Sequence, residues 1–206
     1  MRLDSKLSVA AFVAVVLDAA LLRFLPGGTT LVYLARLSSC LVVLAALLAS
    51  GVPRTSLGVA LGGGGRVLYL AAGCGAGLYA ILIGIALLFR WDLPFRLGRD
   101  FHDWNGAATF AINALLLAPI MEETLYRGIV VSALRHRLPV WGVVVVSGLF
   151  FYLLHLAYGK DWRLLHYLPA GMILGWAFLA SGRLWVPILL HMLGNLLMAL
   201  DDVARL

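Results

Sequence analysis

The chain contains only two glutamates, Glu122 and Glu123, which are adjacent within the otherwise apolar stretch LAPIMEETLYRGIVV. Glu123 and Arg127 are four residues apart, so on a helix they share one face and are able to pair in the favourable order, with the acid first. Glu122 is turned by about 100° from Glu123 around the helix axis. We therefore expect Arg127 to neutralise Glu123, while Glu122 stays available for chemistry.

Two histidines and an asparagine follow at helical spacing. His155 comes four residues after Phe151, and His191 comes four residues before Asn195, so each pair lies on one helix face. Each residue alone has an ordinary structural explanation, since buried histidines are often core residues and asparagine often joins membrane helices. Together with the glutamates they indicate a functional site, because every polar group inside a membrane costs a few kcal/mol or more unless it is paired or hydrated.

These residue types suit the hydrolysis of a peptide bond. That reaction needs a base for water, hydrogen-bond donors for the oxyanion and an acid for the leaving amine. A carboxylate supplies the base, and an asparagine amide or a histidine ring supplies donors. Glu122, His155 and His191 would also form a His₂Glu set of the kind that holds catalytic zinc. The zinc motifs HExxH and HxxEH do not occur in the sequence.

The elements that must position these residues are transmembrane helices. The chain has 206 residues, of which 63% are hydrophobic and 13% charged, whereas soluble domains are roughly 45–50% apolar and 25% charged. We expect an all-α, polytopic transmembrane helix bundle of about seven spans, since each span needs about 20 apolar residues. The expected spans are 7–25, 30–50, 66–90, 107–134, 140–158, 164–181 and 184–200.

We expect residues 1–206 to form one membrane domain. Its N-terminal part, 1–106, would hold three spans and an interfacial segment at 91–106, and 107–200 would be the catalytic core. The run GGGG at 62–65 lacks the Lys and Ser/Thr of a phosphate loop and is interpreted as a connector.

Two further features of the N-terminal part carry predictions about packing. Gly73, Gly75 and Gly77 have a small-residue spacing that favours close helix packing. Asp18 and Arg36 lie on consecutive spans, and we favour a structural ion pair over a catalytic role for them.

The net charge of +6 does not indicate nucleic-acid binding, because the basic residues are scattered singly through short loops. They are interpreted as anchors that flank the spans. Counted on the two sides of a seven-span arrangement, the loop Lys and Arg residues divide equally and set no orientation. The expected location is multi-pass in a prokaryotic inner membrane, and the expected partners are the lipid bilayer and a membrane-anchored protein or peptide substrate.

The three motifs together resemble the signature of the CPBP intramembrane proteases, the family of the type II CAAX prenyl endopeptidases and bacteriocin-processing enzymes. The motifs are Glu122-Glu123-x-x-x-Arg127, Phe151-x-x-x-His155 and His191-x-x-x-Asn195. The resemblance implies a helical membrane endopeptidase with its site inside the C-terminal four-helix part. It implies that Glu122 and His155 activate water, that His191 and Asn195 stabilise the oxyanion, and that Glu123, Arg127 and Phe151 support the site.

The resemblance leaves the metal open, and we favour a metal-free, glutamic-type enzyme over a zinc enzyme. Two other functions fit intramembrane charges. A proton- or ion-coupled transporter also uses Glu, His and Arg within its spans, and a non-catalytic partner or immunity protein would use the same bundle as a scaffold. The substrate class that we favour is a membrane-associated or lipid-anchored protein.

Overall fold

A computed structural model describes residues 3–24, 30–60, 62–89, 108–109, 111–157 and 166–203 of the chain. The expected interfacial segment at 91–106 lies outside these residues. Every regular element of the described part is a helix and none is a strand, which confirms the all-α prediction.

Seven helical rods make up the described part, and their bounds agree with the predicted spans to within a few residues. The fourth rod is built from η2, α5, η3 and α6, which follow one another without a break. The elements are α1 (Leu3–Phe24), α2 (Thr30–Ala49), a short η1 (Arg54–Ser56), α3 (Gly65–Phe89), η2 (Ala111–Leu117), α5 (Ala118–Glu123), η3 (Thr124–Val131), α6 (Ser132–Leu134), α7 (Val140–Ala157), α8 (Tyr167–Ser181) and α9 (Trp185–Val203).

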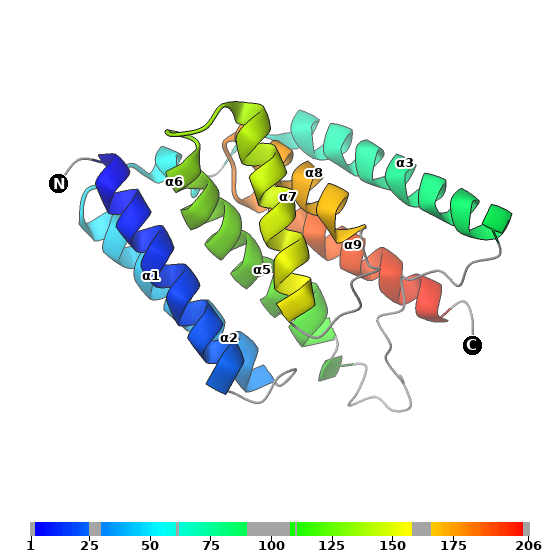
Figure 1. Cartoon of the computed structure of the whole chain (residues 1–206), viewed down its shortest axis with the longest axis horizontal. Coiled ribbons are helices and arrows are strands. Elements are labelled where there is room, and N and C mark those ends of the chain that lie inside the picture. The colour runs from blue at the N-terminus through cyan, green and yellow to red at the C-terminus, as the bar shows by residue number, and fades with distance from the viewer. Residues whose placement is uncertain are drawn as a thin grey trace.

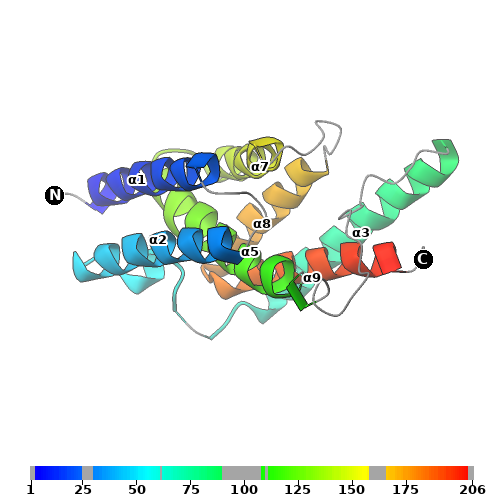
Figure 2. The same cartoon turned by 90° about the horizontal axis from the view of Figure 1, so that it is seen from below.

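The fourth rod runs through the middle of the molecule (Figures 1 and 2). Helices α1 and α2 pack against one side of it, whereas α7, α8 and α9 contact it from the other side. Helix α3 packs against α8 and α9 and lies away from α1 and α2 (Figure 1). The residues that carry the two glutamates are therefore enclosed by helices from both halves of the chain.

The fourth rod is not a uniform α-helix. Its segments η2 and η3 are π-helical, and the short α-helical turn α5 between them holds Glu122 and Glu123. Pro119 lies in the first turn of α5. Proline has no N–H to bond the carbonyl four residues earlier, and its ring clashes with that carbonyl, so a wider turn before it relieves the conflict.

The molecule exposes many large apolar side chains. Phe12 is 71% exposed, Val42 68% and Tyr69 79%, so each of α1, α2 and α3 presents an apolar outer face. Contiguous exposed apolar surface is typical of proteins that meet a membrane or another protein. By length and composition, α1 and α2 are able to cross a membrane, and shorter apolar helices span Gly65–Ile81, Val140–Leu156, Tyr167–Ser181 and Trp185–Leu197.

The closest helix packing occurs between α7 and α8, where glycines let the backbones approach. A Cβ added at Gly171 would lie 2.5 Å from the Cβ of Phe151, and one added at Gly148 would lie 2.7 Å from the carbonyl oxygen of Leu168. The prediction of close packing at Gly73, Gly75 and Gly77 is wrong, because a Cβ at any of them would meet no atom of the described residues within 4 Å.

Candidate active site

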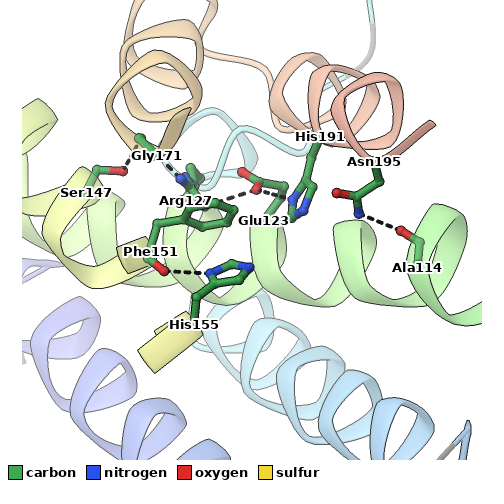
Figure 3. Close-up of polar contacts among 9 residues, drawn as sticks. All are labelled: Ala114, Glu123, Arg127, Ser147, Phe151, His155, Gly171, His191 and Asn195. Atoms are coloured by element: carbon green, nitrogen blue, oxygen red, sulfur yellow. Dashed lines mark hydrogen bonds and ion pairs between the residues drawn. The ribbon is translucent and has the colours of Figure 1, made fainter. Parts of the chain in front are cut away.

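Glu123 is the centre of a buried polar network that joins three elements. Its Oε1 lies 3.0 Å from Nη1 of Arg127 and 2.9 Å from Nδ1 of His191. The carboxylate of Glu123 and the guanidinium of Arg127 are both fully buried. Figure 3 shows the carboxylate between the two partners, with His191 reaching it from α9. The predicted Glu123–Arg127 pair is therefore confirmed, and it has a third member.

Arg127 is held on its other side by α7 and α8. Its Nη2 donates to the carbonyl oxygen of Gly171 at 3.2 Å, and the same carbonyl accepts from the hydroxyl of Ser147 at 3.2 Å. The ring of Phe151 covers the guanidinium, with 5.0 Å between the guanidinium carbon and the ring centroid. Such a cation over an aromatic face is favourable, and more so where water is excluded. Phe151 thus contacts the network as its expected supporting role requires.

His191 has a hydrogen-bond partner that was not predicted. Its Nδ1 contacts Glu123, and the ring also interacts electrostatically with Glu122, near which the sequence places it. Because an ionised carboxylate only accepts hydrogen bonds, Nδ1 carries the proton in this contact. A carboxylate that accepts a hydrogen bond from one ring nitrogen of a histidine sets the orientation of the ring and the role of the second nitrogen. The Nε2 edge of His191 is thereby directed away from Glu123.

Glu122 is buried without a full set of partners. Glu122 is only 4% exposed, and its carboxylate oxygen Oε2 has no hydrogen-bond partner among the described residues. His191 and Arg36 interact with Glu122 electrostatically. Buried carboxylate oxygens without a partner are costly and rare, and they call for a functional explanation. Oε2 of Glu123 also lacks a partner among the described residues, but Oε1 of Glu123 has two. The expected pairing of Glu123 is therefore present.

His155 is set up to accept a proton. Its Nδ1 lies 2.7 Å from the carbonyl oxygen of Phe151, and since a carbonyl cannot donate, Nδ1 must carry the hydrogen. In the neutral ring this leaves the lone pair on Nε2. The ring is stacked on Tyr167, with 3.6 Å between centroids and 19° between planes. Tyr167 was not among the predicted site residues.

Asn195 joins α9 to the fourth rod. Its Nδ2 donates to the carbonyl oxygen of Ala114 in η2 at 2.6 Å (Figure 3). This is the interhelical contact that asparagine often makes in membrane proteins. An amide nitrogen carries two hydrogens, so the second N–H is still able to act on a substrate.

The expected alternative of a zinc site does not fit the described residues. No group of three or more His, Cys, Asp or Glu side chains among them is arranged to hold a metal ion. In particular, Glu122, His155 and His191 do not form the His₂Glu set that their types allow. The reason is visible in the contacts, since His191 is directed to Glu123 and His155 to its own helix.

A second buried ion pair lies between α1 and α2. Arg36 Nε is 2.5 Å from Oδ1 of Asp18, and its Nη2 is 2.8 Å from Oδ2, which confirms the predicted pair. The hydroxyl of Tyr126 also reaches Asp18, at 3.5 Å. Tyr126 follows Glu122 by one turn, so this pair lies beside the face of the fourth rod that carries Glu122.

Comparison with known proteins identifies the part of the chain that holds this network. Residues 104–197 match the family described as type II CAAX prenyl endopeptidase Rce1-like. This part of the chain is similar to the Rce1-like family, over 94 of the 206 residues. The match confirms the resemblance inferred from the three motifs. Helices α1, α2 and α3 lie outside the Rce1-like match.

The chain is also similar to an "Uncharacterized 24.3 kDa protein" of Escherichia coli. The two are 35% identical over 83 residues, which is 39% of this chain and 38% of the E. coli protein. The chain thus matches less than two fifths of that relative's length. No solved structure gives a significant match.

Proposed function

We propose that the protein is an intramembrane endopeptidase that hydrolyses a peptide bond of a membrane-associated or lipid-anchored protein. The observation that carries this proposal is the difference between two adjacent buried carboxylates. Each has an Oε2 without a partner among the described residues, but Arg127 and His191 hold Glu123 through Oε1, and we propose Glu122 as the reacting carboxylate. The Rce1-like match of residues 104–197 supports the same reaction class. A bundle built only for stability has no use for such a carboxylate.

In the proposed mechanism Glu122 and His155 activate the attacking water. They take its proton as the oxygen adds to the scissile carbonyl, and the proton then passes to the leaving amine. We assign the oxyanion to the second N–H of Asn195 and to the Nε2–H of His191 in its doubly protonated form, which the carboxylate of Glu123 at Nδ1 favours. Glu123 acts as a positioning residue because it orients His191. Arg127 holds Glu123, and Phe151 covers the guanidinium of Arg127.

We propose a metal-free reaction in a multi-pass protein of about seven spans, located in a prokaryotic inner membrane. The apolar outer faces of α1, α2 and α3 support the membrane assignment, and two of these helices are long enough to cross. The donor geometry supports the metal-free assignment, since the described residues offer no three-ligand group. The partners are then the bilayer and the membrane-anchored substrate, with no nucleic acid.

The test uses membranes of a deletion strain as the source of substrate. Purified protein is added to the solubilised membranes, and new N-termini are identified by mass spectrometry. We expect Glu122→Gln to reduce cleavage by about 100-fold or more, as the loss of a general base does. The matched control is Met121→Leu, a conservative change at the neighbouring buried position. Full activity of folded Glu122→Gln protein would overturn the proposal.

Metal dependence is tested on the same cleavage reaction. After dialysis against 1,10-phenanthroline, we expect the rate to stay within about twofold of the untreated enzyme, because no proposed step uses a metal. An activity that disappears with the chelator and returns with zinc would exclude the metal-free mechanism and leave the protease assignment standing.

A further inference from the structure

A cavity of about 380 Å³ lies between α3, α8 and α9, directly beside the proposed site. Its volume is at the small end of the roughly 300–1,000 Å³ typical of ligand pockets. His191 and Asn195 both line it, and so does Phe151. The residues assigned to the oxyanion therefore form one edge of this cavity.

Small side chains of α3 create the space. Ala71, Ala72, Gly75 and Ala76 line the cavity, and a Cβ added at Gly75 would meet no atom of the described residues within 4 Å. The opposite wall is formed by larger groups of α8 and α9, such as Ile173 and Leu190. The glycine that was expected to pack closely against another helix instead widens a cavity.

The lining of the cavity is mainly apolar. None of the described lining residues is Asp, Glu, Lys or Arg. Its polar groups are His166, His191, Asn195 and two tyrosines. An apolar pocket with a few polar groups at one edge is the usual form of a site that binds an apolar group and orients it.

The cavity reaches the outer surface of the molecule along α9. Leu193, Leu196 and Leu197 line it and are 46%, 40% and 45% exposed. These side chains belong to the apolar outer surface, so a group attached to a chain in the bilayer is able to enter from the side. The shape thus fits a substrate that approaches within the membrane.

We propose that this cavity is the specificity pocket for a large apolar side chain next to the scissile bond, and that Gly75 and Ala72 set its size. The inference rests on the proposed protease function. The inference extends that function to α3, which lies outside the Rce1-like match. The occupant must be carried close to the scissile carbonyl, because that carbonyl is assigned to His191 and Asn195 at the cavity edge. Leucine, methionine and phenylalanine are the side chains of suitable chemistry.

The first test compares cleavage profiles of wild type, Gly75→Leu and Gly73→Leu on a mixed peptide library in detergent. Gly73 is the matched control, since it lies on the same helix in open space and does not line the cavity. We expect wild type and Gly73→Leu to prefer Leu, Met or Phe at one position beside the cut. Gly75→Leu should shift that preference at least tenfold toward Ala or Gly, and Ala72→Leu should do the same. An unchanged profile in both cavity variants would overturn the inference.

The second test measures binding and does not depend on cleavage. A hexapeptide with a central photo-leucine is irradiated with the protein, and the labelled residues are mapped by mass spectrometry. We expect labels on cavity residues of wild type and Gly73→Leu, reduced at least fivefold in Gly75→Leu and competed by the matching leucine peptide. No label in the cavity, or competition only by an S-alkylated peptide and not by the leucine peptide, would overturn the inference. Cavity labelling without any cleavage activity would instead contradict the proposed protease function.

Discussion

At the scale of single residues, replacing each of the two adjacent glutamates should change the free energy of unfolding differently. Oε1 of Glu123 accepts hydrogen bonds from Arg127 and His191, whereas Oε2 of each glutamate has no partner among the described residues. We expect Glu123→Gln to lower the free energy of unfolding by about 3–5 kcal/mol, because it leaves Arg127 buried without its counter-charge.

Glu122→Gln should leave the free energy of unfolding unchanged or raise it, since it removes a buried charge that is not fully satisfied. Unfolding of both variants in detergent, followed by circular dichroism during titration with sodium dodecyl sulfate, measures the difference. Equal destabilisation by the two substitutions would contradict the division of roles between the two carboxylates.

The Asp18–Arg36 pair gives a second residue-scale prediction. Arg36→Met should destabilise the protein by about 3–5 kcal/mol, because it leaves the carboxylate of Asp18 buried and unpaired. The double variant Asp18→Leu/Arg36→Met should recover most of that loss, as apolar replacements of buried pairs often do. The same unfolding titration applies, and cleavage is measured in parallel. A folded double variant without activity would show that the pair is catalytic and not structural.

The sequence was most informative at this residue scale. The Glu123–Arg127 and Asp18–Arg36 pairs were predictable, because one follows from helical spacing and the other from the need to pair charges in consecutive spans. The bond from His191 to Glu123 was not predictable, since the rotation of α9 about its own axis depends on its packing. The contact between Arg127 and the carbonyl of Gly171 was also missed. Every residue has a backbone carbonyl, so residue type does not indicate which one binds arginine.

At the scale of elements, the contact between α7 and α8 determines the position of Arg127. Gly171 brings these helices close together and supplies the carbonyl that Arg127 contacts. Gly171→Ala should destabilise the protein by about 1–3 kcal/mol through overpacking against Phe151. It should also reduce the cleavage rate.

The control is Gly73→Ala on α3, which meets no described atom and should be neutral or stabilising by up to about 1 kcal/mol through helix propensity. Thermal unfolding of the two variants in one detergent compares them directly. A Gly171→Ala protein as stable and active as Gly73→Ala would show that the close approach is not required.

The bounds of the helices were predictable from apolar run length and from Pro and Gly between the runs, but the internal form of the fourth rod was not. The π-helical segments η2 and η3 flank the turn that carries Glu122 and Glu123. Apolar periodicity does not distinguish one wide turn from an α-helical turn within a short stretch. Such π-helical turns are frequent at functional sites, and here they adjoin the proposed catalytic residues.

At the scale of the whole molecule, the exposed apolar surface predicts contact with lipid. Cys74 is exposed on α3, and Cys40 is buried on α2. A nitroxide attached to Cys74 in a Cys40→Ala background should collide more often with oxygen than with a water-soluble nickel chelate, because oxygen concentrates in the hydrocarbon region. Electron paramagnetic resonance in liposomes measures both rates. Preferential collision with the nickel chelate would place this face of α3 in water and contradict the expected third span.

The main buried cluster has a consequence for any attempt to isolate the family domain. The face of the fourth rod formed by Met121, Leu125 and Ile129 packs into a cluster that α1 and α2 complete. A fragment confined to residues 104–197 would leave that face uncovered and would also lose the small-residue wall of α3. We therefore expect that the segment matched to relatives does not fold on its own. Truncated expression, domain grafting and chimeras that join it to foreign N-terminal helices should begin by preserving the contacts of α1 and α2.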